Sequence, residues 1–278
     1  MSHGRFFGAL TSRSQTPVRL PCAWILVTVV MTSLSPVSAR ITRTRPSAAS
    51  TSVAEAGPSV WGLFYPVVLG GGLEFQSDRD QSEYRLPFLI EYNVTERIRL
   101  TLEPELVHIV GKTKNARSVH GSGDIEAWVA YEFVTERRYR PSLSAEVGNR
   151  WPTAVDPDLG EPGRDYTVGL IATKDLVIVD VDVNAFYTFV GDREREDTVE
   201  LSLSTEWHVN PYIDLIAEVA TVTQVGSSRG DQPRNEVECT LGVAWLVNRF
   251  FRLEHGIVLS ERGGWEVIFG WEWNIGGD

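Results

Sequence analysis

The chain has 278 residues, of which 26 are basic and 37 are acidic, so its net charge at neutral pH is −11. An acidic chain is repelled by a phosphate backbone, which argues against nucleic acid as a partner. The composition is 42% hydrophobic and 10% aromatic. The spacing of these apolar residues along the chain indicates the fold class.

The N-terminus has the pattern of a secretory signal peptide. Three arginines precede an apolar run at 23–31, and the small-residue stretch that follows ends at Ala39. This predicts a signal peptide over 1–39, cleaved after Ala39. Its apolar run is too short to span a bilayer as a helix. Cleavage would leave 23 basic against 37 acidic residues, net −14, and Cys239 alone, which excludes an internal disulfide and a cysteine metal cluster.

The next two segments precede any regular pattern. Residues 40–57 are rich in Ser, Thr, Ala and Arg, and we interpret them as a flexible leader. Residues 58–70 contain Trp61, Phe64 and Tyr65. They fit either a short interfacial or plugging segment or an early start of the first strand.

From Gly71 onward, apolar and polar residues alternate, which is typical of β-strands. The second segment has Tyr84 and Tyr92 at its ends and aliphatic residues between them on the same face, as two membrane interfaces require of one strand. Pro104 cannot donate to a sheet, so we expect a bulge or break there. The expected strands cover 71–76, 84–92, 98–103, 124–133, 142–148, 166–172, 177–189, 199–208, 213–219, 236–247, 251–259 and 264–275.

The last segment has the clearest polarity. Three tryptophans, Trp265, Trp271 and Trp273, share one face, and Glu266 and Glu272 lie on the other. This favours a strand with lipid outside and a wet lumen inside. The soluble alternative is a lipocalin-like barrel, in which the same tryptophans would form the core.

Long polar connections alternate with short turns along the chain, as expected when one rim faces the periplasm and the other the outside. The sequence therefore predicts an all-β fold, an antiparallel up-and-down transmembrane β-barrel of about 12 strands with a polar lumen and aromatic girdles. The barrel should cover 71–275, followed by a tail at 276–278, and strand 264–275 should pair with both 250–260 and 71–76. An even number of strands closes the sheet without edges.

The polar faces supply the candidate lumen residues. They could form a cation-attracting channel, or they could pair with one another and fill a narrow barrel. The candidates are Arg85, Arg99, Glu126, Glu132, Asp180, Asp182, Glu200, Glu206, His208, Glu218, Glu238, Arg252, Glu254 and Glu272. The candidate lipid-facing girdle consists of Tyr84, Tyr92, Trp207, Trp245, Trp265, Trp271 and Trp273.

The histidines are the candidate general bases of this chain. By alternation His208 points inward near Ser204 and Glu206, while His108 and His255 point outward. Residues i and i+4 of a strand are about 13 Å apart, too far for proton transfer. We expect no enzymatic activity, no catalytic residue, no cofactor and no metal.

Two short motifs carry a resemblance to a known family. Gly121-Ser122-Gly123-Asp124 leads into Ala130-Tyr131-Glu132-Phe133, and Trp151-Pro152-Thr153 follows. In this order they resemble the MetA-pathway of phenol degradation family of outer-membrane barrels, over roughly 70–275. Departures are Asn93 before its turn and Ala154 after Pro-Thr, where the family more often has Gly.

The resemblance implies passive uptake of small hydrophobic or aromatic solutes through the outer membrane of a double-membraned bacterium. Expected partners are outer-membrane lipid, the barrel-assembly machinery and a small hydrophobic solute. The alternative is a structural or surface-interaction barrel, whose lumen is closed by its own side chains and whose long loops at 111–122 and 151–163 meet a partner.

Overall fold

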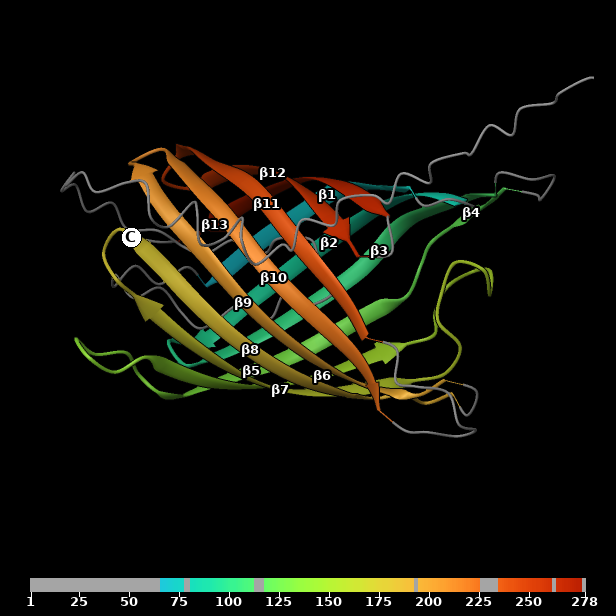
Figure 1. Ribbon diagram of the computed structural model, residues 1–278, viewed down its shortest axis with the longest axis horizontal. Coiled ribbons are helices and arrows are strands. Elements are labelled where there is room, and N and C mark those ends of the chain that lie inside the picture. Colours follow the sequence, from blue (N-terminus) through green and yellow to red (C-terminus); the bar gives the residue numbers. More distant parts are fainter. Residues whose placement is uncertain are drawn as a thin grey trace, which may run out of the picture. The chain divides into compact units, whose positions relative to one another are not determined.

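The computed structural model describes residues 66–77, 81–112, 118–192, 195–225, 235–261 and 264–276 (Figure 1). All of them belong to one of two compact units of the chain, 35–278. The expected signal peptide at 1–39, the leader at 40–57 and most of the segment at 58–70 lie outside these ranges. No helix in the described ranges is long and apolar enough to cross a membrane.

The described ranges contain twelve long strands and one short one. The twelve long strands follow one another along the chain, and the short strand β4 lies between β3 and β5. The bounds are β1 Val67–Ser77, β2 Gln81–Thr95, β3 Ile98–Lys112, β4 Val119–Gly121, β5 Ile125–Val134, β6 Ser142–Trp151, β7 Asp165–Asp175, β8 Val179–Phe189, β9 Asp197–Asn210, β10 Ile213–Val225, β11 Asn235–Asn248, β12 Phe251–Ser260 and β13 Trp265–Ile275.

The sheet closes on itself as an antiparallel barrel. Each long strand pairs with its neighbours in the chain, β5 follows β3 in the wall, and β4 pairs with β3 alone. β13 pairs with β12 and also with β1, in a register that runs from Val67 opposite Ile275 to Ser77 opposite Trp265. Both the predicted barrel of about twelve strands and its closure through the last strand are confirmed, and the strands run obliquely around it (Figure 1).

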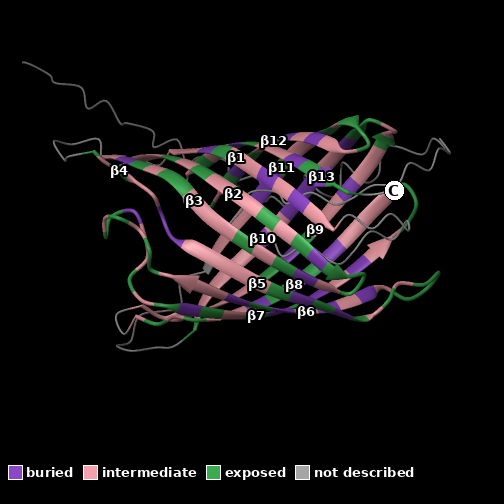
Figure 2. Cartoon of the chain, turned by 180° about the vertical axis from the view of Figure 1, so that it is seen from behind, coloured by how far each residue is buried: buried purple, intermediate pink, exposed green. Residues whose placement is uncertain are grey.

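Exposed apolar and buried polar residues alternate along the strands (Figure 2). On β5, Val129, Tyr131 and Phe133 are 49%, 48% and 46% exposed, whereas Glu132 between them is 7% exposed. A soluble barrel would bury the apolar set instead. The outer surface therefore matches a lipid environment and the lumen is polar, as the alternation predicted.

The two rims differ in the length of their connections. At one rim the turns are short, such as 96–97 between β2 and β3, 211–212 between β9 and β10, and 249–250 between β11 and β12. At the other rim several connections are longer, such as 152–164 between β6 and β7. We call these the short-turn rim and the long-loop rim. β1 begins and β13 ends at the short-turn rim.

Pairing between β2 and β3 is irregular where the sequence predicted a bulge or break. Leu86 pairs with Val107 and Pro87 with Glu105, which leaves Leu106 as an extra residue; the next pair is Ile90 with Leu102. The extra residue reverses the inward and outward faces of the rest of β3. The prediction that His108 points outward is therefore wrong, because His108 contacts the lumen carboxylates of Glu83 and Glu105.

Candidate functional site

The fourteen candidate lumen residues are all buried or half-buried, on the face of the sheet opposite to the exposed apolar residues. Eight are less than 9% exposed: Arg99, Glu132, Asp182, Glu206, Glu218, Arg252, Glu254 and Glu272. The other six are half-buried: Arg85, Glu126, Asp180, Glu200, His208 and Glu238. Some of them form an ion-paired network near the short-turn rim, and others line a cavity nearer the long-loop rim.

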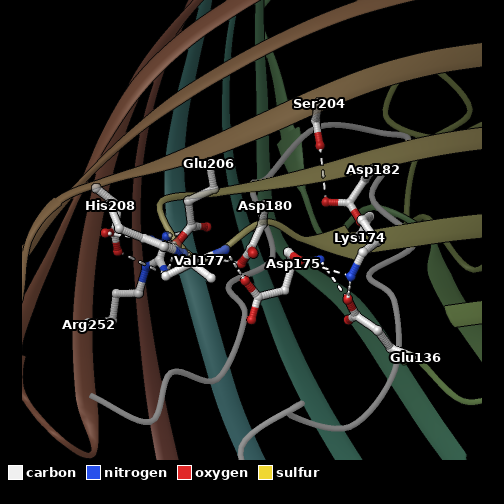
Figure 3. Close-up of polar contacts among 11 residues, drawn as sticks. Glu136, Lys174, Asp175, Val177, Asp180, Asp182, Ser204, Glu206, His208 and Arg252 are labelled. Carbon is white, nitrogen blue, oxygen red and sulfur yellow. Dashed lines mark hydrogen bonds and ion pairs between the residues drawn. The ribbon is translucent and has the colours of Figure 1, made fainter. Parts of the chain in front are cut away.

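Arg252 on β12 is the centre of the network near the short-turn rim (Figure 3). Its Nη1 and Nη2 each donate to the Glu206 carboxylate of β9 at 3.2 Å, and its Nε lies 2.7 Å from Glu254. Nη1 is also 3.8 Å from Asp214. The planar guanidinium group satisfies several carboxylates at once, which a lysine could not do with the same geometry.

His208 lies beside this network. Its Nδ1 is 3.0 Å from Asp214, and its Nε2 is 3.4 Å from Asp180. Ser204, two strand positions beyond Glu206, instead donates to Asp182 at 3.5 Å. His208 thus contacts carboxylates from neighbouring strands, an arrangement of mutual charge compensation.

Ligand atoms of Glu206, His208 and Asp214 lie within 4.8 Å of one another, a spacing that a metal ion could bridge. The same two carboxylates, however, already face the guanidinium group of Arg252. A divalent cation at this point would have to displace a fixed positive charge. The donor set therefore fits an ion-pair network better than a metal site.

A second polar group lies at the short-turn rim in the same view (Figure 3). Lys174 at the end of β7 pairs with Glu136, and Thr173 donates to Asp182 at 2.5 Å. In the adjacent turn Val177 has a φ of 76°, unusual for a β-branched residue, and its N–H is held by Asp175. These contacts fix the turn between β7 and β8.

Arg99 on β3 compensates two further carboxylates, those of Glu146 at 3.0 Å and Glu91 at 3.5 Å. Four residues further along β3, Glu103 lies opposite Glu126 of β5. Two acidic side chains are therefore adjacent in this part of the lumen wall.

A cavity of about 720 Å³ lies next to these glutamates. Among the described residues that line it, thirteen carry a carboxylate and two, Arg85 and Arg150, carry a guanidinium group. Arg85 is shared between Glu74 at 3.5 Å and Glu266 at 3.6 Å, and Arg150 pairs with Asp165. Excess negative charge in a confined lumen raises the local concentration of cations.

The lumen also contains aromatic side chains that the sequence analysis did not identify. Trp128 lines the cavity, and its ring meets Phe186 edge to face with 6.5 Å between centroids. Each ring lies over a glycine of a neighbouring strand. A Cβ on Gly148 would come within 2.3 Å of the Trp128 ring, and a Cβ on Gly169 would come within 2.0 Å of the Phe186 ring. The sequence feature that could have identified Trp128 is its position on the same face of the strand as acidic residues.

The candidate girdle residues lie on the outer face near the two rims. Tyr84 and Trp265 are 46% and 40% exposed, and both lie beside Phe75 near the long-loop rim. The other girdle residues lie near the short-turn rim and are exposed or half-buried: Tyr92, Trp207, Trp245, Trp271 and Trp273. Trp271 is partly covered because it packs against Gly71 and Phe88.

No protein-family model matches the chain, and no curated protein sequence matches it either. Solved structures with the same fold do exist. The COG4313 outer membrane channel from Pseudomonas putida F1 superimposes with a TM-score of 0.57 at 14% identity, covering 82% of this chain and 99% of that one.

Two further similar structures are porins. The NanC porin has a TM-score of 0.55 at 10% identity and covers 75% of this chain and all of its own. The KdgM porin in complex with disordered oligogalacturonate has a TM-score of 0.54 at 10% identity and covers 76% of this chain and all of its own. At these identities the likeness establishes the fold.

The chain thus has the fold of the outer-membrane β-barrels, with an exposed apolar outer surface and a polar lumen. The resemblance to the MetA-pathway of phenol degradation family is supported to this extent, and membership of that particular family stays a prediction. The aromatic girdles, and the alternation of short turns with longer connections, agree with a location in the outer membrane.

Proposed function

We propose that the chain is a passive outer-membrane channel for small solutes, and that it favours solutes that join a positive charge to an apolar or aromatic body. The observation that carries this proposal is the cavity of about 720 Å³, with its thirteen carboxylates against two guanidinium groups. A volume of this size accommodates a small organic molecule. The excess of fixed negative charge sets the preferred sign of its charge.

The same charge argues against transferring a ligand from the structural neighbours. Oligogalacturonate, which is bound in the KdgM structure, is a chain of carboxylates. Glu103 and Glu126 face each other in the cavity wall here, and they would repel such a polyanion. The shared fold therefore supports a channel, while the lumen supports a different class of solute.

Support for an apolar or aromatic part of the solute comes from two places. The Trp128 ring lines the cavity and offers a face on which a cation or a second ring can rest. Phe88 and Leu89 also line the cavity, at the point where pairing between β2 and β3 is interrupted. These apolar groups are consistent with the uptake of hydrophobic or aromatic solutes that the family resemblance implies.

One observation favours the alternative of a closed structural barrel. Arg252 is 2% exposed and links β12 to Glu206 of β9 across the lumen side of the wall. If such pairs fill the lumen, nothing passes, and the barrel acts through its surface. The two functions predict opposite results in a transport assay.

The test is flux into proteoliposomes in symmetric potassium chloride, with two solutes that share a ring and differ in charge, benzyltrimethylammonium and benzenesulfonate. We expect the cation to enter faster, by roughly tenfold, because the lumen charge acts on the two in opposite directions. The double variant Glu103→Gln/Glu126→Gln should reduce this ratio. Glu96→Gln, in an exposed turn of the short-turn rim, is the matched control and should leave it unchanged.

Faster entry of the anion would contradict the proposed charge preference. Entry of neither solute, together with no conductance in planar bilayers, would favour the structural barrel.

A further inference from the structure

The connection between β6 and β7, residues 152–164, lies at the long-loop rim, and its segment 158–161 lines the cavity. Leu159 in this loop is 1% exposed. Asp158, Leu159, Gly160 and Glu161 line the same cavity as the glutamates of the barrel wall. The loop therefore contributes two carboxylates and one apolar side chain to the lumen.

A single carboxylate, that of Asp124, holds both ends of this loop. Its Oδ1 accepts the backbone N–H groups of Thr153 and Ala154, both at 3.0 Å. Its Oδ2 accepts the N–H of Glu161 at 2.8 Å. Asp124 is 8% exposed. A buried carboxylate that accepts three N–H groups forms strong charge-assisted bonds, and losing it would remove three hydrogen bonds between the wall and the loop.

The loop is fitted closely around this carboxylate. A Cβ at Gly160 would lie 2.6 Å from Asp124 Oδ1, so the chain can pass at this point only as glycine. Val155 donates its N–H to the Ser122 carbonyl oxygen at 3.2 Å. From the wall, the His108 Nδ1 lies 2.9 Å from the Leu159 carbonyl oxygen.

These contacts explain why the two motifs of the chain occur together. Asp124 ends the Gly-Ser-Gly-Asp stretch, and Thr153 and Ala154 follow Trp151-Pro152. They are separated by about thirty residues in sequence and joined by hydrogen bonds in space. The motif residues thus build a fixed connection between the barrel wall and the loop.

We propose that Asp124 is a positioning residue that sets the width and the selectivity of the channel mouth. By fixing Thr153, Ala154 and Glu161, it keeps the segment 158–161 at the channel mouth, where Asp158 and Glu161 line the cavity together with the glutamates of the wall. The solute then passes between the loop and the wall, where both sides carry negative charge. This inference rests on the proposed channel function and adds the residue that determines its size limit.

The test compares Asp124→Ala with the wild-type full chain in planar bilayers and in liposome swelling with neutral sugars of increasing size. Without the three hydrogen bonds the loop is released from the lumen, so we expect single-channel conductance to rise by roughly twofold or more and larger sugars to enter. Asp124→Asn keeps the Oδ1 acceptor and should give an intermediate increase.

The matched control is Asp197→Ala. Asp197 lies at the same rim and accepts the N–H of Val190 and the hydroxyl of Tyr187, but it does not line the cavity. Its loss should leave conductance and size limit at the wild-type values. A difference in electrophoretic migration between unheated and heated samples, equal to that of the wild type, will show that each variant forms a barrel.

A reversible cross-link gives an independent check of the same idea. In a Cys239→Ser background, Ser122→Cys and Val155→Cys place thiols on two residues already joined by a backbone hydrogen bond. Added to Asp124→Ala, their oxidation should return the conductance to the wild-type value, and a reductant should raise it again.

The outcomes separate the two proposals. A conducting wild type with an unchanged Asp124→Ala variant overturns the role of Asp124 and leaves the channel function standing. Silence of both proteins in both assays overturns the channel function. A silent wild type with a conducting Asp124→Ala variant supports the positioning role, with the loop closing the mouth.

Discussion

Arg252 shows how the lumen residues depend on one another. It is 2% exposed, and Glu206, Glu254 and Asp214 all approach its guanidinium group within 3.8 Å. Removing one partner of a buried ion pair leaves the remaining charges uncompensated. We expect Arg252→Met to lower the free energy of unfolding by about 3 kcal/mol, measured by urea titration in lipid vesicles.

Arg249→Met, in the exposed turn before β12, is the control for this prediction and should change stability by less than about 0.5 kcal/mol. Adding Glu206→Gln to Arg252→Met should recover part of the loss, because it removes one of the uncompensated charges. Equal stability of Arg252→Met and the wild type would show that the network does not stabilise the barrel.

At the scale of single residues, the alternation of polar and apolar residues correctly predicted which acidic side chains point into the lumen. Glu132 and Glu272 are 7% and 5% exposed, on the face expected from their neighbours. Alternation could not predict what each charge contacts. Arg252 reaches Glu206 over a separation of 46 residues, and such a partner depends on the closed barrel.

At the scale of elements, the closing pair of strands can be tested directly. Leu73 of β1 and Phe269 of β13 are cross-strand partners on the outer face, so their Cα atoms lie within the range that a disulfide can bridge. In a Cys239→Ser background we expect Leu73→Cys/Phe269→Cys to form an intramolecular disulfide during folding, detected as a shift in non-reducing electrophoresis.

The control pair is Leu73→Cys with Leu259→Cys. Leu259 pairs with Trp265 and not with β1, so no cross-link should form. A free thiol count of two in the Leu73/Phe269 variant would contradict the closure of the barrel between β1 and β13.

The long strands were predictable because they repeat a period of two with the same polarity over most of their length. The short strand β4 lies within the loop predicted at 111–122 and was not predicted. The error at His108 arose within one strand, where Leu106 is an extra residue in the pairing of β3 with β2. Pro104 predicted an irregularity in this strand, but it did not predict that the extra residue would be Leu106. A shift of one residue reverses the two faces, so the remaining part of the strand could not be placed from its pattern.

The loop at 152–164 was unpredictable for a different reason. Its composition indicated a long polar connection, as for any surface loop. Its path over the cavity depends on hydrogen bonds from Thr153, Ala154 and Glu161 to Asp124, which are 29 to 37 residues apart in sequence. Local patterns contain no information on contacts of this kind.

At the scale of the whole molecule, the barrel places its two sets of charges at different depths. The Arg252 network lies toward the short-turn rim, and the cavity with its excess of carboxylates lies toward the loop at 152–164. Glu254 belongs to both, since it lines the cavity and contacts Arg252. A solute that enters past the loop would therefore meet negative charge first and an ion-paired network afterwards.

The central claim is that the lumen of this barrel conducts and that its fixed negative charge selects cations. The most direct measurement is the reversal potential of the purified wild-type chain in a planar bilayer with a potassium chloride gradient. We predict a reversal potential displaced toward the equilibrium potential of potassium. A displacement toward the equilibrium potential of chloride, or a bilayer that stays silent, would contradict it.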